Sequence, residues 1–196
     1  PDLRPEDSFS WEVGFETDFG RPVTASALYF DSRFRNLINY DPTFSTLVNV
    51  DQARSRGAEL ALTVRFAPWV TANAAWTILE TRDETTNTPL PRRPRNVASL
   101  SVRIQPEPRL VIVPELLLAG PSPEGAYARY GNDGTAYPVA GYNKPGAVLN
   151  LGAQWRWTDR ITLFADARNL TNSRYEPANG FVIPGRSVLV GTRFGF

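Results

Sequence analysis

Apolar and polar residues alternate along most of the chain. In residues 147–157 every odd position carries Ala, Leu or Trp, whereas the even positions between them are mostly small or polar. Because successive side chains of a β-strand point to opposite faces, this period of two predicts strands with one apolar and one polar face. The pattern predicts about nine strands, which cover roughly residues 9–19, 22–39, 48–66, 70–82, 95–105, 109–120, 146–157, 160–170 and 185–196.

Two of these segments depart from regular alternation. Between Val23 and Ile38 the apolar positions change phase near Phe30. In residues 110–118 both faces are apolar, and Pro114 lies inside the predicted strand. Since proline donates no backbone hydrogen bond to a neighbouring strand, we expect a bulge or an irregular stretch here.

The predicted connections are alternately short and long. Tight turns are indicated at residues 19–22, 67–69, 105–108 and 158–159. The intervening connections are long and cover residues 40–47, 83–94, 121–145 and 171–184. In an up-and-down antiparallel sheet every second connection lies at the same end, so one end has short turns and the other has large loops. This asymmetry is typical of outer-membrane β-barrels.

The composition agrees with a membrane barrel and with a soluble sheet. Mean hydropathy is −0.29, and no stretch approaches the roughly 18 to 20 apolar residues of a transmembrane helix. A barrel has such a composition because only alternate side chains meet lipid. A soluble β-sandwich or lipocalin-like barrel would also alternate, around a closed core. The membrane barrel is favoured by aromatic residues beside the short turns, where an interfacial girdle would lie: Phe19, Phe66, Trp69, Trp155 and Trp157.

Absent residue types exclude several chemistries. The chain contains no His, Cys or Met, which excludes disulfides, His or Cys metal sites, and catalytic groups built on imidazole or thiolate. Its acidic residues are dispersed, so a paired-carboxylate hydrolase has no evident site. A net charge of +1 argues against a nucleic-acid binder, which normally has a clustered excess of Lys and Arg. We therefore expect neither an enzyme nor a cofactor.

Short motifs occur in a characteristic order along the whole chain. Near the C-terminus they are Asn169-Leu170-Thr171-Asn172, then Pro184-Gly185-Arg186, and a last strand that ends in Phe196. The upstream motifs are Leu3-Arg4-Pro5-Glu6, Asn36-Leu37-Ile38, Gly57-Ala58-Glu59 and Leu90-Pro91-Arg92-Arg93-Pro94. In this order they resemble the TonB-dependent outer-membrane receptors. The Pro-Gly-Arg and Leu-Pro-Arg-Arg-Pro elements resemble the cobalamin-receptor branch of that family.

The resemblance implies an all-β fold, an antiparallel up-and-down transmembrane β-barrel in the bacterial outer membrane. The family barrel has about 22 strands and is plugged. Residues 1–196 then correspond to about nine strands of its C-terminal part, and the plug domain and the energy-coupling box lie outside this sequence.

The resemblance also implies a function in active transport. The expected activity is TonB-dependent uptake of a scarce nutrient, either a corrinoid such as cobalamin or a ferric siderophore. The implied partners are outer-membrane lipid, the receptor's own plug domain and remaining barrel strands, the TonB complex, the barrel-assembly machinery and a small-molecule ligand. A passive porin-like or structural barrel segment is the alternative, and a soluble β-sandwich binding module is a more distant one.

Three sets of residues are candidates for functional contacts. The inner charged set is expected to line the lumen, where its members pair with one another or, as the family implies, hold the plug: Glu12, Glu16, Glu59, Arg65, Arg103, Arg156, Asp166, Arg168 and Arg193. The loop set comprises candidate ligand contacts, or incidental side chains of mobile loops: Tyr40, Phe44, Tyr127, Arg129, Tyr130, Tyr137 and Tyr142. The family further implies a C-terminal signal for the barrel-assembly machinery: Val188, Val190, Phe194 and Phe196.

Overall fold

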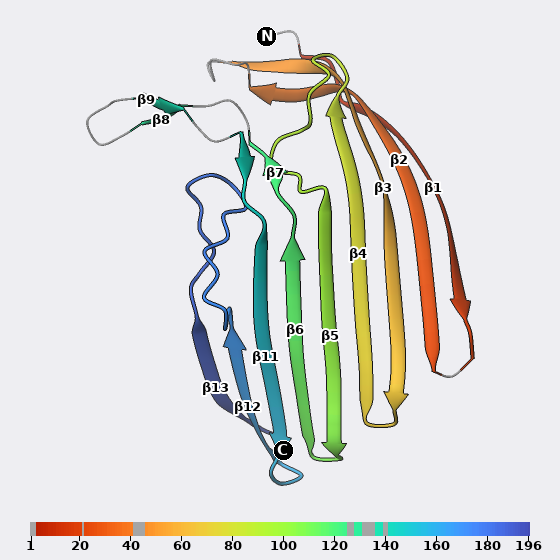
Figure 1. Ribbon diagram of the computed structural model, residues 1–196, viewed down its shortest axis with the longest axis vertical. Coiled ribbons are helices and arrows are strands. Elements are labelled where there is room, and N and C mark those ends of the chain that lie inside the picture. Colours follow the sequence, from red (N-terminus) through yellow and green to blue (C-terminus); the bar gives the residue numbers. More distant parts are fainter. Residues whose placement is uncertain (1–2, 21, 41–45, 125–127, 131–135, 139–140) are drawn as a thin grey trace.

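The computed structural model describes residues 3–20, 22–40, 46–124, 128–130, 136–138 and 141–196, and its main element is one nine-stranded sheet. Figure 1 shows these strands side by side in one layer. They are β1 (Asp7–Asp18), β2 (Val23–Tyr40), β3 (Leu47–Ala67), β4 (Val70–Asp83), β5 (Asn96–Glu107), β6 (Leu110–Ala119), β11 (Gly146–Arg156), β12 (Ile161–Arg168) and β13 (Ser187–Phe194).

The order of strands in the sheet follows the order in the chain. Every neighbouring pair is antiparallel, and the strand order is β1-β2-β3-β4-β5-β6-β11-β12-β13. Two small ribbons lie in the connection between β6 and β11. One pairs β7 (Ser122–Pro123) with β10 (Tyr142–Asn143), and the other pairs β8 (Ala128–Tyr130) with β9 (Ala136–Pro138). The predicted all-β, up-and-down antiparallel fold is confirmed. Within the residues that the structure describes, no helix has the length and apolar character needed to cross a membrane.

The sheet has two chemically different faces and almost no core. Among the described residues, Ala53 is the only buried apolar side chain. Directly paired residues of neighbouring strands share a face, so the register aligns the apolar positions in rows across the sheet. One such row contains Phe15, Ala27, Leu60, Trp76, Ala98 and Leu118. We call this side the apolar face and the opposite side the polar face. Phe15 is 65% exposed, which shows that nothing within the described chain covers the apolar face.

The predicted change of phase near Phe30 is wrong. The register of β2 with β3 is regular from Val23 to Arg35, so the odd-numbered residues of β2 stay on the apolar face over that length. What changes is their chemistry, because from Asp31 onward they are charged or polar for several positions. The strand continues beyond the apolar band, and the altered pattern records this change of environment.

The irregularity predicted around Pro114 is present on one side of its strand. Pro114 pairs with Leu151 of β11 in regular register. On the other side, the pairing of β5 with β6 skips from Ser101 to Ile104 and then shifts before Glu107. This agrees with the missing N–H of proline, which removes one rung from the ladder with β5.

Short turns and long loops separate to opposite ends of the sheet, as predicted (Figure 1). Gly20 occupies the turn between β1 and β2 with a φ of 81°, a left-handed conformation that glycine adopts without steric cost. The aromatic residues predicted to form a girdle are exposed beside the short turns: Phe19, Phe66, Trp69, Trp155 and Trp157.

The N-terminal motif holds an irregular point in the two longest strands. Asn36 has a φ of 55°, and the Nδ2 of Asn49 donates to its carbonyl oxygen over 2.6 Å. The backbone N–H of Arg4 donates to Asn49 Oδ1 over 2.8 Å. A carboxylate oxygen of Glu6 accepts from the backbone N–H of Ile38, also over 2.8 Å. The Leu-Arg-Pro-Glu and Asn-Leu-Ile motifs therefore meet at one place.

Glycines on the polar face make room for large neighbours. A Cβ atom on Gly57 would lie 2.2 Å from the backbone oxygen of Ile78 and 3.0 Å from the ring of Phe30. A Cβ on Gly191 would lie 2.4 Å from the ring of Phe164. In both places an aromatic ring on one strand occupies the space above a glycine of the next strand, and this packing favours the observed register.

Candidate functional site

The polar face carries a hollow across β5, β6, β11 and β12. Its volume is about 530 Å³. Its polar lining comprises Arg103, Glu115, Asn150, Gln154, Asp166 and Arg168. Asn150 donates to a carboxylate oxygen of Glu115 over 2.9 Å, and Arg103 donates to Gln105 over 2.9 Å. The charged groups of this hollow form no ion pairs within the described residues, which suits a hydrated contact with another polar surface.

All members of the inner charged set lie on the polar face. The register places Arg65 and Arg103 in one row, on either side of Thr71, and it places Arg156 and Arg193 in another, on either side of Thr162. Within the described part of the chain, none of the set forms an ion pair with another member. The ion pairs found there involve other residues. The suggestion that these charges neutralise one another is therefore not supported by the described structure.

A second polar arrangement joins the long connections at the other end of the strands. We call it the Glu124 cluster, and it comprises Arg92, Glu124, Asn143 and Asn179. The buried carboxylate of Glu124 accepts from Arg92 Nε over 2.8 Å, from Asn143 Nδ2 over 2.6 Å and from the backbone N–H of Asn179 over 2.9 Å. Arg92 also donates its backbone N–H to Pro123 over 2.7 Å. The cluster thus ties together the connections 84–95, 120–145 and 169–186.

The charge of Glu124 is stabilised by its donors. Burial alone would raise the pKa of the Glu124 carboxyl, but the hydrogen bonds from Arg92, Asn179 and Asn143 outweigh it and lower the pKa below its ordinary value of 4.5. Arg92 holds a φ of 59°, which is unfavourable for a residue with a Cβ atom. The paired backbone and guanidinium contacts of Arg92 offset this strain.

Asn169 organises the connection after β12. Its side chain is buried and donates to the carbonyl oxygens of Ser173 and Pro184, over 3.0 and 2.9 Å, while its Oδ1 accepts from the backbone N–H of Ser173. Asn172 accepts from the backbone N–H of Arg186 over 3.2 Å. Both asparagines of the motif have left-handed backbones, with φ of 50° and 51°. The motif is thus a compact turn that fixes the entry and the exit of this connection.

The same connection covers part of the polar face. The ring of Tyr175 lies so close to Gly146 that a Cβ there would be 2.3 Å from it. Tyr175 and Ile183 roof an apolar hollow of about 460 Å³ over β4, β5, β6 and β11. Burial raises the pKa of the Tyr175 hydroxyl.

Among the described residues, no group of acidic side chains is arranged to hold a metal ion.

A family model described as "TonB dependent receptor-like, beta-barrel" matches residues 1–170. The chain belongs to the TonB-dependent receptor family. Members of this family are β-barrel proteins of the Gram-negative outer membrane, so the predicted family, fold and location are confirmed. The family model names no branch, so the cobalamin branch stays a prediction.

Solved structures of receptors share the fold at low sequence identity. The ferric-catecholate import receptor Fiu from E. coli K12 matches with a TM-score of 0.75 at 15% identity, over 100% of this chain and 28% of that one. The copper transporter OprC matches with a TM-score of 0.79 at 19% identity, over 100% and 32%. A variant of the ferric enterobactin receptor PfeA from Pseudomonas aeruginosa matches with a TM-score of 0.77 at 19% identity, over 99% and 32%. The chain therefore spans about three tenths of these structures.

Most of the loop set lies outside the described residues of this receptor. Phe44 and Tyr127 fall in undescribed segments, and for Tyr40, Arg129, Tyr130 and Tyr137 the side chains are outside the description. Tyr142 is described and is 61% exposed, beside Asn143 of the Glu124 cluster. The structure therefore leaves the loop set as a prediction.

The C-terminal set lies on the last strand of the receptor sheet. Val188, Val190 and Phe194 are exposed on the apolar face, and Phe196 follows the end of β13. Strand β13 pairs with β12 along one edge, and no other described strand pairs with it.

Sequence reasoning missed the Glu124 cluster. Glu124 was indistinguishable from any other carboxylate in a long loop, because its partners lie 32, 19 and 55 residues away. The one available signal was Arg92, which lies within a motif and between two prolines.

Replacing Glu124 by Gln in the intact receptor is expected to loosen these loops. Each hydrogen bond to a charged group contributes about 1.5 to 3 kcal/mol, so we expect loop proteolysis at pH 7 to rise about tenfold or more. Because folding lowers the pKa of Glu124, its stabilisation is full above pH 4.5 and is lost as the pH falls through the folded pKa.

Pepsin digestion of the wild-type receptor should therefore show loop cleavage that increases as the pH falls below 4.5. Cleavage of the E124Q variant should change less over the same pH range. The control is Glu107→Gln, an exposed carboxylate beside a short turn. Equal cleavage of wild type and E124Q at pH 7 would show that the cluster does not hold the loops.

Proposed function

We propose that the intact receptor imports a scarce nutrient across the outer membrane by TonB-dependent active transport. The observation that carries the proposal is the family match over residues 1–170. The proposed substrate is a ferric siderophore or a corrinoid. The names of similar structures, a ferric-catecholate import receptor and a ferric enterobactin receptor, support the ferric chelate.

The proposed division of labour follows the two faces and the two ends of the sheet. The apolar face contacts lipid, and the polar face lines the lumen against a plug domain that belongs to the remainder of the receptor. The loop set captures ligand at the long-loop end, because exposed Tyr side chains offer a large face and a polar tip. The TonB complex acts on the part of the receptor outside residues 1–196.

Uptake by cells that express the intact receptor tests this function. Labelled ferric siderophores and cobalamin are supplied to cells with and without TonB, and we expect accumulation of one ligand class in the presence of TonB only. The Tyr142→Ala variant is expected to raise the ligand concentration for half-maximal uptake by about two- to tenfold, since a stacked aromatic contact contributes roughly 0.5 to 1.5 kcal/mol. Uptake that persists without TonB would instead support a passive porin-like barrel.

The inner charged set is proposed to hold the plug. Exposed ion pairs contribute about 0 to 1 kcal/mol each, and a sum of such contacts suits a plug that must move. Arg103 and Arg168 line the same hollow, so the double variant Arg103→Gln, Arg168→Gln removes neighbouring contacts together. We expect more frequent channel openings of the intact receptor in planar bilayers.

The control for this experiment is Arg109→Gln, which removes one positive charge from the short turn between β5 and β6. An unchanged conductance in the double variant would count against plug contacts at this hollow.

The C-terminal set is proposed to be read by the barrel-assembly machinery. A last strand with exposed apolar side chains at alternate positions suits recognition by strand addition. Removal of Phe196 is expected to lower the amount of heat-modifiable, folded receptor in the outer membrane severalfold. Phe181→Ala is the control, because Phe181 is also an exposed aromatic residue but lies in the connection before β13. Equal amounts of both variants would contradict the proposal.

A further inference from the structure

The apolar face of β1 to β4 becomes charged toward the long loops. The last wholly apolar or aromatic row contains Val13, Tyr29, Ala58 and Ile78. The next row contains Trp11, Asp31, Arg56 and Glu80, and the row after it contains Phe9, Arg33, Arg54 and Arg82. Register therefore places these charges on the membrane-facing side of the wall, beyond the apolar band.

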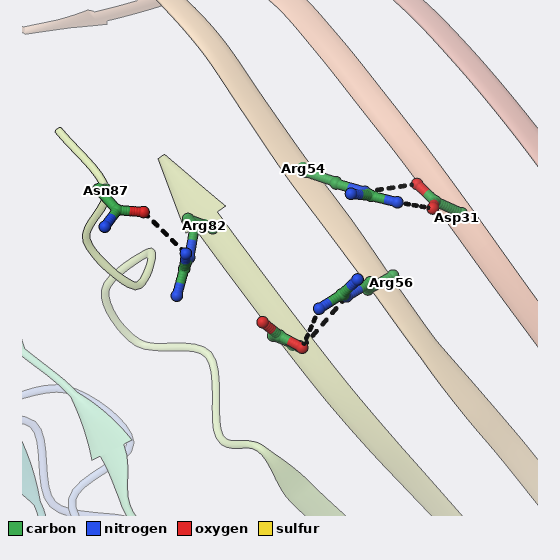
Figure 2. Close-up of polar contacts among 6 residues, drawn as sticks. Asp31, Arg54, Arg56, Arg82 and Asn87 are labelled. Carbon is green, nitrogen blue, oxygen red and sulfur yellow. Dashed lines mark hydrogen bonds and ion pairs between the residues drawn. The ribbon is translucent and has the colours of Figure 1, made fainter. Parts of the chain in front are cut away.

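The carboxylates of this region hold two of its guanidinium groups. Figure 2 shows Arg54 directed at Asp31, with which it forms an ion pair. Arg56 forms an ion pair with Glu80 over 2.8 Å. Asp31 is only 3% exposed, so its ion pair with Arg54 lies beneath the longer side chains. Arg54 is thus held by a buried carboxylate, whereas Arg56 meets Glu80 at the surface.

Positive charge is in excess in this region. Arg33 and Arg82 flank Arg54 on the neighbouring strands, and both are exposed. We call Arg33, Arg54 and Arg82 the arginine row. No ion pair of Arg33 or Arg82 is found in the part of the chain that the structure describes. Arg82 is oriented by a 2.7 Å hydrogen bond to Asn87 (Figure 2).

Like charges directly opposite one another in a sheet destabilise it. The arginine row places guanidinium groups side by side on three strands, with one buried carboxylate below them. An anion that contacts several of these groups at once would remove this repulsion. Guanidinium groups bind phosphate oxygens in a bidentate manner, so phosphate is the anion that this geometry suits best.

The position of the row identifies the source of the phosphate. Trp11 and Tyr29 lie in contact next to it, with ring centroids 5.5 Å apart, and such aromatic residues mark the boundary between the apolar band and the lipid headgroups. The row lies just beyond this boundary at the long-loop end, which is the extracellular end of such barrels. A lipid headgroup of the outer leaflet is therefore the anion at this height.

We propose that the arginine row binds the phosphate groups of the phosphorylated glycolipid that forms the outer leaflet of the outer membrane. Arg33 and Arg82 contact phosphate from the two sides, and Arg54, held by Asp31, contacts it between them. The acyl chains of the same lipid then lie against the rows of the apolar face below.

The test uses the intact receptor purified in detergent, with purified lipid A as the probe. Native mass spectrometry measures how much lipid A stays bound as its concentration is lowered. The double variant Arg33→Gln, Arg82→Gln is expected to bind roughly tenfold more weakly or worse, which corresponds to about 1.4 kcal/mol or more. Arg33→Lys, Arg82→Lys keeps the charge but loses the planar fork, so its affinity should be intermediate.

The matched control is Arg160→Gln, which removes one guanidinium group at the short-turn end of the same sheet. Heat-modifiable migration verifies that each variant is folded, and the Lys pair supplies a folded comparison if the Gln pair is not. Full lipid A binding by the Gln pair, or by the Lys pair if that is the folded one, would overturn the proposal. An equal loss in R160Q would also overturn it, and so would equal, arginine-dependent binding of phosphatidylglycerol.

Discussion

The constraint on which this structure depends is that its sheet has no second layer. A soluble domain buries one face of each sheet in a core, but here Ala53 is the only buried apolar side chain among the described residues. Stability must then come from the backbone ladder and from what lies against each face. Such a sheet can lie in the hydrocarbon core of a bilayer only where its backbone N–H and C=O groups are hydrogen-bonded. The regular pairing of β2 with β3 from Val23 to Arg35, and of β3 with β4 from Ala53 to Arg65, meets this demand.

The two faces consequently follow different rules. On the apolar face, side chains need bulk and few polar atoms, and packing within the protein is unimportant. On the polar face, large rings lie above glycines, as Phe30 does at Gly57 and Phe164 at Gly191, which gives each strand pair its own fit. Side-chain packing on the polar face therefore favours the observed register, whereas the side chains of the apolar face make the sheet compatible with lipid.

Alternation was sufficient to predict the strands, their order and the separation of turns from loops, because each of these depends on local pattern. It failed at Phe30, since periodicity reports the environment of a strand as well as its phase. The residues after Phe30 keep their face but leave the apolar band. The Glu124 cluster was beyond local pattern altogether, because its members come from distant connections. Asn169 was noticeable as a motif, but its bonds to Ser173 and Pro184 depend on the path of the later chain.

The lengths of β2 and β3 have a mechanical consequence. In β2, the apolar band from Val23 to Tyr29 takes up about 20 Å at roughly 3.4 Å per residue, and the strand continues to Tyr40. About 30 Å of paired strand therefore extends past the band, and Glu6, Arg4 and Asn49 brace it partway along. Figure 1 shows this end of the β2–β3 ribbon turned across the long-loop end of the sheet instead of continuing along the strand direction. That end of the wall therefore carries hydrogen-bonded ribbon, which is stiffer than a loop of the same length.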